Sequence, residues 1–351
     1  MIADYNWIDD NSDLEQLILS LKSSDEVAFD SEFERINTFF PKPALFQLKI
    51  NGRYFLIDMK KVTNHEVFQR LLDNIILHSG SEDLEILYNL NKQLPTHIFD
   101  TQIAASLCGY GLHYSYQNIV KQLFGVELSK AHSRSDWMQR PLSAEQIDYA
   151  LEDVLYLPEI KSMLMDQLKQ MKRVPWYQLL MEQRKKAIIN SNHVDKTFIK
   201  TCKSKRFDVR QQKLLYALLN WREEIARKRD KPRQWILKNT QIVELVYKQP
   251  DSKAKLIDNI GLHIKFVEYN ADSIFSLYHE SESLNCEHLP QFSKLSSKQG
   301  EKFVKVKQQL NDVCEKLDIP RALIINNTDL KSLIAEDMEL NDIEMWQLVN
   351  S

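Results

Sequence analysis

The pair Asn51-Gly52 constrains the fold of this chain more than any other feature of the sequence. It separates two apolar runs, residues 44–50 and 53–58, in which apolar and polar side chains largely alternate. An Asn-Gly pair between two such runs is the strongest short-range signal for a β-hairpin, because both residues tolerate the positive φ values of a tight turn. A further apolar run at residues 26–33 precedes the hairpin. The sequence therefore predicts an early sheet of three strands, at least two of them antiparallel.

Strand and helix patterns alternate after the hairpin. Short strands are predicted at residues 75–78 and 98–100, and helices at 13–21, 65–72, 82–90, 101–108 and 116–123, with Ser81 as the cap of the helix at 82–90. Ser143 and Gln146 match a capping box, which predicts a helix from residue 144 to about 156, where Pro158 interrupts the pattern. From about residue 207 the pattern is wholly helical. The predicted fold class is an α/β domain with helices on a mixed sheet, followed by all-α domains.

Composition excludes several classes of protein. A chain of 351 residues predicts two or three domains, and 43% hydrophobic with 27% charged residues is typical of a globular protein. The four cysteines are scattered and form no zinc or disulfide pattern, which fits a reducing compartment. No apolar run approaches the ~18 residues of a membrane span, and the polar N-terminus is unlike a signal peptide. We therefore expect a cytoplasmic protein with no membrane partner. We also expect a monomer, although no feature of the composition predicts the oligomeric state.

The charge is unevenly distributed along the chain. The net charge is −3, yet the stretch 200–240 contains thirteen Lys and Arg against four Asp and Glu. Residues 328–345 contain one Lys against six acids. This balance excludes a globally basic nucleic-acid binder but predicts a local basic surface.

Two acids stand in the first predicted strand, which reads VAFDSEF. Asp30 and Glu32 are two residues apart, so their side chains lie on the same face of the strand. Ionised acids in an apolar setting need a partner, and Mg²⁺ or Mn²⁺ would satisfy such a pair. The alternative is a strand end at which both carboxylates reach water.

Two later helices carry further candidate residues. Asp83 lies in the first turn of a helix that follows a short strand, where α/β sheets often place their sites. Tyr149 and Asp153 are four residues apart and share one helix face. The alternatives are ordinary first-turn electrostatics for Asp83, and a surface acid beside a half-buried tyrosine for the second pair.

Together, these residues resemble the four-acid pattern of the DEDD exonucleases. The stretches FDSEFERINTFFPKPALFQLKI, LHSGSEDLEILYNL, FDTQIAASLCGYG and SRSDWMQRPLSAEQIDYALEDVLYLPEI are each similar, in this order, to segments of bacterial ribonuclease D. The segment LLYALLNWREEIARKRDKPRQWIL resembles the start of the HRDC domain of that family. The resemblance extends from about residue 20 to 260.

The resemblance implies a fold and a chemistry. It implies a ribonuclease H-like exonuclease domain of the DEDD type at residues 1–200, and an HRDC helical domain at 207–282. For residues 285–351 we expect a second, degenerate HRDC-like domain. The implied activity is 3′–5′ exoribonuclease hydrolysis with two divalent cations, Mg²⁺ or Mn²⁺, releasing nucleoside 5′-monophosphates. The implied substrate is RNA with a short single-stranded 3′ end, with tRNA precursors as the family's choice.

The resemblance also assigns roles to the candidate residues. Asp30, Glu32 and Asp153 would hold one cation, Asp30 would bridge to the second, and Asp83 would support the second. Tyr149 places the chain in the tyrosine subtype, in which this hydroxyl positions the attacking water. Because four clustered acids repel one another, we expect raised carboxylate pKa values in the cation-free protein.

Other residues are candidate RNA contacts with structural alternatives. Phe33 would stack on a terminal base or belong to the core, and His78 would contact substrate or be a hydrogen-bonded structural residue. The remaining basic candidates would bind phosphates or form solvated faces, and they are Lys130, Arg134, Arg140, Arg222, Arg227 and Arg229. Two rival functions are a DNA 3′–5′ exonuclease with the same acids and a non-catalytic RNA-binding scaffold.

Overall fold

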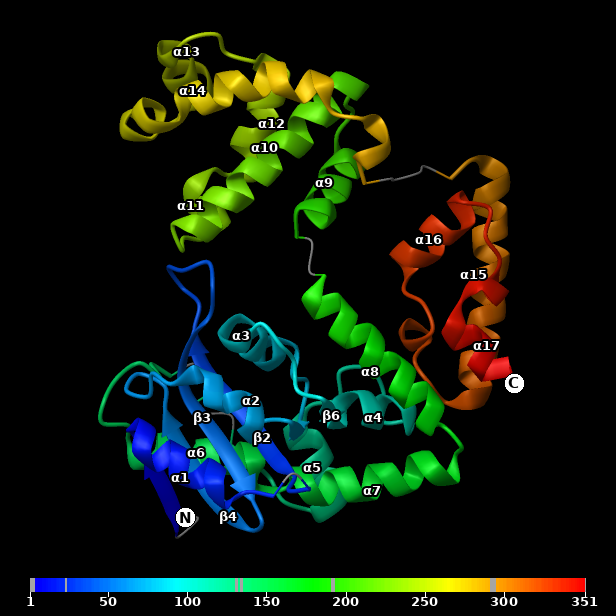
Figure 1. Cartoon of the computed structure of the whole chain (residues 1–351). Helices are drawn as coiled ribbons and strands as arrows, with labels where there is room; N and C mark the ends of the chain where they lie inside the picture. The colour runs from blue at the N-terminus through cyan, green and yellow to red at the C-terminus, as the bar shows by residue number, and fades with distance from the viewer. Residues whose placement is uncertain are drawn as a thin grey trace. The chain divides into compact units, whose positions relative to one another are not determined.

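The computed structural model of the chain describes residues 4–22, 24–129, 132, 135–190, 193–290 and 295–350 (Figure 1). It divides into two compact units, each described by itself. Unit 1 comprises the described residues up to 34, those from 41 to 190 and the C-terminal residues 295–350. Unit 2 comprises residues 35–40 and 193–290.

A six-stranded mixed sheet forms the centre of unit 1. Its strand order is β1-β4-β3-β2-β5-β6. β3 is antiparallel to both of its neighbours, whereas β1 pairs with β4, and β5 with β2 and β6, in parallel. The strands are β1 (Tyr5–Ile8), β2 (Val27–Glu34), β3 (Lys42–Ile50), β4 (Arg53–Asp58), β5 (Asn74–Leu77) and β6 (His97–Asp100).

The predicted hairpin is confirmed as β3 and β4. Asn51 and Gly52 both have positive φ, 49° and 78°, as their turn requires. β1, in contrast, was not predicted. It has only four residues, two of them exposed, and exists because it pairs with the edge of β4. Such a strand depends on tertiary pairing, since its own sequence carries little pattern.

Helices and short 3₁₀ turns cover the sheet of unit 1. The capping box of Ser143 and Gln146 is confirmed at the start of α6, and the predicted interruption falls at Tyr156, after which α7 begins with Pro158 in its first turn. The elements are α1 (Asn11–Ser20), η1 (His65–Val67), α2 (Phe68–Leu71), α3 (Ser81–Asn91), α4 (Thr101–Leu107), α5 (Tyr116–Phe124), α6 (Ala144–Leu155), α7 (Leu157–Gln170) and α8 (Val174–Ile189).

One predicted cap is wrong. Ser81 is the first residue of α3 rather than its cap, and Gly80 occupies the cap position without a side-chain hydrogen bond. The Asp100 carboxylate accepts hydrogen bonds from the backbone N–H groups of Ser79 and Gly80, at 3.1 and 3.2 Å. These two bonds give the backbone N–H groups of the turn before α3 an acceptor at the end of β6. The Ser81 hydroxyl contacts Arg184 on α8 instead.

The C-terminal helices belong to the core of unit 1. Leu310, Cys314 and Trp346 are buried in one cluster with residues of α4, α7 and α8. Arg173 donates hydrogen bonds of 2.5 Å to the carbonyl oxygens of Leu107 and Leu317, and so ties this segment to α4. The C-terminal elements are α15 (Ser297–Leu317), η4 (Arg321–Leu323), α16 (Asn327–Ala335), η5 (Leu340–Asp342) and α17 (Glu344–Asn350).

Unit 2 is wholly helical apart from its loops, as the sequence predicts. Its core contains Phe198, Leu218 and Leu245, none of which is accessible to solvent. The elements are α9 (His193–Ser204), α10 (Val209–Lys228), α11 (Arg233–Ile236), α12 (Asn239–Lys248), α13 (Lys253–Ile260), α14 (Ile264–Glu280), η2 (Ser281–Ser283) and η3 (Cys286–His288). Over the part of the chain that the structure describes, no helix has the length and apolarity that crossing a membrane requires.

Candidate active site

The first two acids project from the middle of the sheet. On β2, Asp30 and Glu32 share a face with Ala28, while Phe29 and Ser31 face the opposite side, as strand alternation requires. The register with β3 shifts between Glu32 and Phe33, which marks a β-bulge at the carboxyl end of the acidic pair. Both carboxylates are half-buried.

Helix α6 brings the third acid and the tyrosine to the same place. It packs across β2 and β3, with Ala150, Leu151 and Tyr149 buried against Leu45 and Leu56 of the sheet. The buried face of α6 also carries Asp153, one turn after Tyr149, and the Tyr149 hydroxyl is hydrogen-bonded to the Asp153 carboxylate. The shared helix face predicted for these two residues therefore points at the acids of β2.

Three acids from distant parts of the sequence meet in one cluster. Asp30, Glu32 and Asp153 each offer a carboxylate oxygen, and these atoms lie within 4.8 Å of one another. These three carboxylates would hold a divalent cation, since Mg²⁺, Mn²⁺ and Ca²⁺ all bind carboxylate oxygens. All donors of the cluster are carboxylates, which suits hard cations and not copper or a structural zinc.

The fourth acid, Asp83, is bound by Ser31, whose side chain lies on the opposite face of β2 from Asp30 and Glu32. Asp83 is buried in the first turn of α3 and accepts a hydrogen bond of 2.5 Å from the Ser31 hydroxyl. A Cβ on Gly80, in the turn before α3, would lie 2.4 Å from a methyl carbon of Leu77, so any other residue there requires the Leu77 side chain to shift. Asp100 caps α4 and also holds this turn, so it acts on Asp83 through the backbone.

The site destabilises negative charge. Burial, followed by the charges of the neighbouring acids, raises the pKa of Asp30 well above its usual range and that of Glu32 to about 9. Burial is also the first cause that raises the pKa of Asp153 to about 7 and that of Asp83 to about 6. The pKa of Tyr149 is raised as well, by burial and then by the charge of Asp153. The predicted rise in carboxylate pKa values is confirmed, and a cation would relieve it.

Two of the other candidate residues have their polar groups engaged inside unit 1. Both ring nitrogens of His78 are hydrogen-bonded, to the Thr101 hydroxyl at 2.8 Å and to the Tyr114 carbonyl oxygen at 2.9 Å. Arg140 forms a two-pronged ion pair with the buried Asp58, with both distances 2.8 Å, and also donates to the Ala44 carbonyl oxygen at 2.7 Å. These contacts give His78 and Arg140 structural roles, as the alternative to RNA contact expects for His78, and RNA contact by either residue stays a prediction.

The candidates in unit 2 separate into buried and exposed side chains. Arg222 is only 2% exposed and donates to the Leu237 carbonyl oxygen and the Asn239 side chain, which corrects its expected place on an RNA surface. Arg227 is exposed but lies over the ring of Phe39 at 5.1 Å, and Arg229 is exposed.

The remaining candidates belong to unit 1 or lie outside the described residues. Phe33 is half-buried and packs against the core on the far face of the sheet. Lys130 and Arg134 lie outside the described residues.

Two supporting residues escaped the sequence analysis. Ser31 separates the two acids on β2, and its hydroxyl donates to the Asp83 carboxylate. The hydroxyl of Tyr116 donates to the Glu152 carbonyl oxygen and accepts from the backbone N–H of Tyr156, both at 3.0 Å, and so fixes the end of α6 next to Asp153. No local signal in the sequence marks either contact, because the partners are far apart along the chain.

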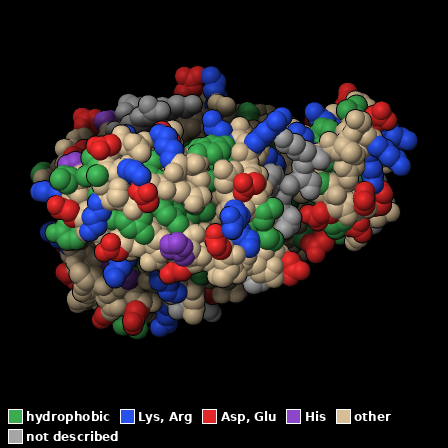
Figure 2. All heavy atoms as spheres, turned by 90° about the horizontal axis from the view of Figure 1, so that it is seen from above, with side chains coloured by type: hydrophobic (Ala, Val, Ile, Leu, Met, Phe, Trp, Pro, Cys, Tyr) green, Lys and Arg blue, Asp and Glu red, His purple; other side chains and the backbone are tan. Residues whose placement is uncertain are grey.

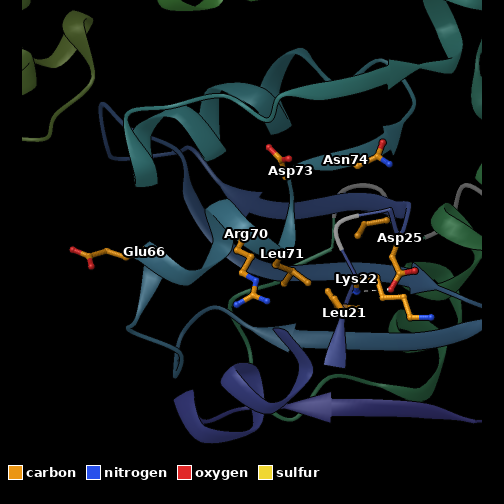
Figure 3. A pocket seen from close by; sticks show the side chains of 9 residues that line it. Leu21, Lys22, Asp25, Glu66, Arg70, Leu71, Asp73 and Asn74 are labelled. Atoms are coloured by element: carbon orange, nitrogen blue, oxygen red, sulfur yellow. Dashed lines mark hydrogen bonds between the residues drawn. The ribbon is translucent and has the colours of Figure 1, made fainter. Parts of the chain in front are cut away.

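A separate pocket of about 520 Å³ lies at the opposite end of the strands (Figure 3). Its lining includes Val27 and Asn74, the first residues of β2 and β5. Lys22 and Arg70 line it together with Asp25 and Asp73, so the lining carries charges of both signs. The pocket does not contain the acidic cluster and is not the candidate active site.

The sheet, the acidic cluster and the helical second unit together define a class of protein. Residues 5–169 match the family model described as 3′-5′ exonuclease, and residues 211–278 match the HRDC domain. The chain is thus a 3′–5′ exonuclease with an HRDC domain.

Curated relatives and a solved structure narrow the class further. The chain is 30% identical over 324 residues to ribonuclease D of Shewanella sp. (strain ANA-3), covering 91% of this chain and 84% of the relative. It is 32% identical over 296 residues to ribonuclease D of Bartonella henselae, covering 82% and 72%. The crystal structure of Escherichia coli RNase D, described as an exoribonuclease involved in structured RNA processing, matches with a TM-score of 0.85 and 26% identity, covering 95% and 90%. The chain belongs to the ribonuclease D family, and it is a hydrolytic 3′–5′ exoribonuclease.

Proposed function

We propose that the protein trims RNA from the 3′ end by phosphodiester hydrolysis at the cluster of Asp30, Glu32 and Asp153, and releases nucleoside 5′-monophosphates. The observation that carries the proposal is the convergence of these three carboxylates to within 4.8 Å. The hydrogen bond between Tyr149 and Asp153 adds a hydroxyl at the same place. Hydrolysis of a phosphodiester requires an activated water and a stabilised leaving oxygen, and this donor set fits the cations that supply both.

Each side chain has a separate part in the proposed mechanism. Asp30, Glu32 and Asp153 would hold one cation, while Asp30 and Asp83 would hold a second. When bound, the two cations supply a hydroxide nucleophile near neutral pH and stabilise the departing 3′ oxygen. Tyr149 orients the attacking water through its hydroxyl, which its raised pKa keeps protonated. Ser31 holds Asp83 in place by donating to its carboxylate.

The proposed substrate is RNA with a short single-stranded 3′ tail, with tRNA precursors as the particular case. The similarity to an RNase D described as acting in structured RNA processing supports this choice. A cytoplasmic, monomeric enzyme is part of the same proposal. The two rivals predict different results, since a DNA exonuclease would prefer deoxyribose and a scaffold would bind RNA without releasing nucleotides.

A basic groove in unit 2 supports RNA contact outside the active site. It has a volume of about 770 Å³ and lies between α9 and α12, and we call it the α9–α12 groove. Lys196 and Lys200 line it one helical turn apart, and Lys205 follows α9 directly. All three side chains are exposed, and no ion pair with a described residue occupies them. Glu244, the acid among the described lining residues, is paired with Lys248 at 3.1 Å.

The α9–α12 groove also offers a hydroxyl and an aromatic ring. Thr197, Thr201 and Ser204 line it from α9, and the hydroxyls of Thr201 and Ser204 donate to carbonyl oxygens of the helix. The Thr197 hydroxyl is of the kind that binds phosphate oxygens. Tyr247 is 46% exposed at its edge and stacks on Phe207. Lysines beside an exposed aromatic ring suit a single strand, since phosphates and bases are then both contacted.

A local surface of this kind is needed because the chain has no general excess of positive charge. Figure 2 shows Lys and Arg side chains interspersed with Asp and Glu over the face it presents. The net charge of the chain is −3. We therefore propose that the α9–α12 groove, rather than the region around the buried Arg222, makes the phosphate contacts of unit 2.

The nuclease proposal is tested by hydrolysis of a 3′-extended tRNA. Wild type with Mn²⁺ is expected to release mononucleotides from the 3′ end, whereas Asp153→Asn, or wild type in EDTA, is not. Matched RNA and DNA oligonucleotides form the second arm. A faster rate on DNA would overturn the substrate proposal, and tRNA binding without mononucleotide release would establish the scaffold.

The groove proposal is tested by RNA binding in the Asp153→Asn background, which prevents degradation of the probe. Replacing Lys196, Lys200 and Lys205 with alanine is expected to weaken tRNA binding at least tenfold. The slope of log affinity against log salt should become shallower by about 2 to 3, as the loss of three phosphate contacts requires. The matched control replaces three lysines of α13 and α14, which are Lys253, Lys255 and Lys265. Equal losses in both triple variants would mean that the groove has no special role.

A further inference from the structure

A buried glutamine lies beside the acid that the proposed function places between two cations. Gln47 is on β3, directly opposite Asp30 in the antiparallel register of β2 and β3. Side chains of directly opposed residues lie on the same face of a sheet, with Cβ atoms about 4.5–5.5 Å apart. Gln47 therefore lies on the face of Asp30, beneath α6.

The neighbours of Gln47 on β3 confirm which face this is. Leu45, two residues before it, is buried in one cluster with Tyr149 and Leu151 of α6. Lys49, two residues after it, donates to the Leu155 carbonyl oxygen at the end of α6 at 2.5 Å. Gln47 lies between them in the same row, so its side chain is enclosed between the sheet and the helix that carries Tyr149 and Asp153.

The carboxamide of Gln47 has no hydrogen-bond partner among the described residues. The residue is 0% exposed, and both its Nε2 and its Oε1 are buried and unpaired. Buried amides are nearly always hydrogen-bonded, because an unpaired one destabilises the fold. Its neighbours across the strands are Asp30 on β2 and Leu56 on β4, and Leu56 offers no polar side-chain group. An apolar side chain would fill this position without that penalty, so the amide points to a role in the site.

We propose that Gln47 is a positioning residue of the acidic site, whose carboxamide donates a hydrogen bond to the ionised Asp30 carboxylate and holds it in the orientation that receives the cation. The proposal rests on the proposed function, since it concerns a residue that orients a cation ligand. Partners that orient the ligands of a metal commonly change metal affinity or activity by about 10–100-fold when they are removed. Gln47 would act through Asp30 and need not touch substrate.

The test measures cation binding and stability apart from activity. Gln47→Leu removes both unpaired polar atoms with little change in volume, and Gln47→Met is a second variant should the first not fold. Isothermal titration with Mn²⁺ is expected to give an affinity about 10–100-fold weaker than wild type. Thermal unfolding in EDTA is expected at the same or a higher temperature. Leu56→Met is the matched control, because Leu56 opposes Gln47 on β4 and has no polar group. Its Mn²⁺ affinity should equal that of wild type.

Three outcomes separate this proposal from the function on which it rests. If wild type binds Mn²⁺ and Gln47→Leu and Gln47→Met bind it within twofold of wild type, the positioning role is overturned while the acidic site stands. A lower unfolding temperature in EDTA with unchanged Mn²⁺ affinity would likewise reduce Gln47 to a packing role. If wild type itself does not bind Mn²⁺, the proposed function fails.

Discussion

Replacing Asp153 with asparagine is expected to stabilise the cation-free protein at pH 8. The pKa of Asp153 is raised from 3.8 to about 7, first by burial and then by neighbouring acids. The folded protein therefore binds this proton more tightly than the unfolded chain does. The stability of wild type must then fall as the pH rises from about 4 to about 7, because the folded state is forced to ionise a group that it holds poorly.

The size of the effect follows from the two pKa values. The difference between 3.8 and about 7 corresponds to about 4 kcal/mol at roughly 1.4 kcal/mol per pKa unit. Asp153 is only half-buried, and solvent screening reduces this to about 1–3 kcal/mol. For a domain of this size, each kcal/mol moves the unfolding midpoint by about 2–4 °C. The expected gain for Asp153→Asn at pH 8 is therefore several degrees, and at pH 4 it should vanish.

The assay is thermal unfolding by circular dichroism in EDTA between pH 4 and pH 8. Asp148→Asn is the matched control, since Asp148 lies on the same helix and outside the acidic cluster. With Mn²⁺ the order should reverse at pH 8, because the cation stabilises wild type and the variant has lost a ligand. A gain for Asp153→Asn that does not depend on pH, or a loss of stability at pH 8 in EDTA, would refute the reasoning.

Three further predictions concern single residues. Tyr149→Phe should lower kcat about 100-fold, as loss of one positioned hydroxyl does, and a parallel loss of Mn²⁺ affinity by titration would contradict a role in orienting water. Arg140→Ala leaves the buried carboxylate of Asp58 unpaired and should lower the free energy of unfolding by about 3–5 kcal/mol in urea. The pKa of Asp58 lies below its usual value, so this loss should shrink as the pH falls below about 4, and Asp58→Asn in the same chain should recover part of it. Phe198→Ala opens a cavity in the core of unit 2 and should destabilise that unit by about 3–5 kcal/mol, seen as faster hydrogen exchange in α9 and α10 while unit 1 exchanges as before.

Interactions between residues close in the sequence predicted the hairpin turn and the start of α6. Asn51 and Gly52 predicted the turn of the hairpin because few other pairs accept its backbone angles. Ser143 and Gln146 predicted the start of α6 because their hydrogen bonds form within one turn. The same kind of reasoning failed at Ser81, where a carboxylate on another strand satisfies the backbone instead.

Contacts between distant segments decided the rest of the fold. The short strand β1 forms because it pairs with β4. The C-terminal helices join the core of unit 1, and the periodicity of their sequence did not predict this packing. In the sequence Arg222 belongs to a basic cluster. In the structure it is buried and donates a hydrogen bond to Asn239, the first residue of α12. Hydrophobic periodicity identifies a helix face, but only packing determines which charged side chain that face encloses.

From the sequence alone, strand alternation and helix periodicity placed Asp30 with Glu32 and Tyr149 with Asp153, and the resemblance to the DEDD exonucleases singled out these residues, with Asp83, as the candidate site. Only the tertiary structure decided that the two pairs meet, that Ser31 holds the fourth acid, and that Gln47 is enclosed beside Asp30 without a partner. The physical reason is the separation along the chain between the residues that interact. Side-chain direction repeats over two or four residues and can be read locally, whereas burial, pairing and the resulting pKa values depend on other segments of the chain, such as those of Asp30 and Asp153.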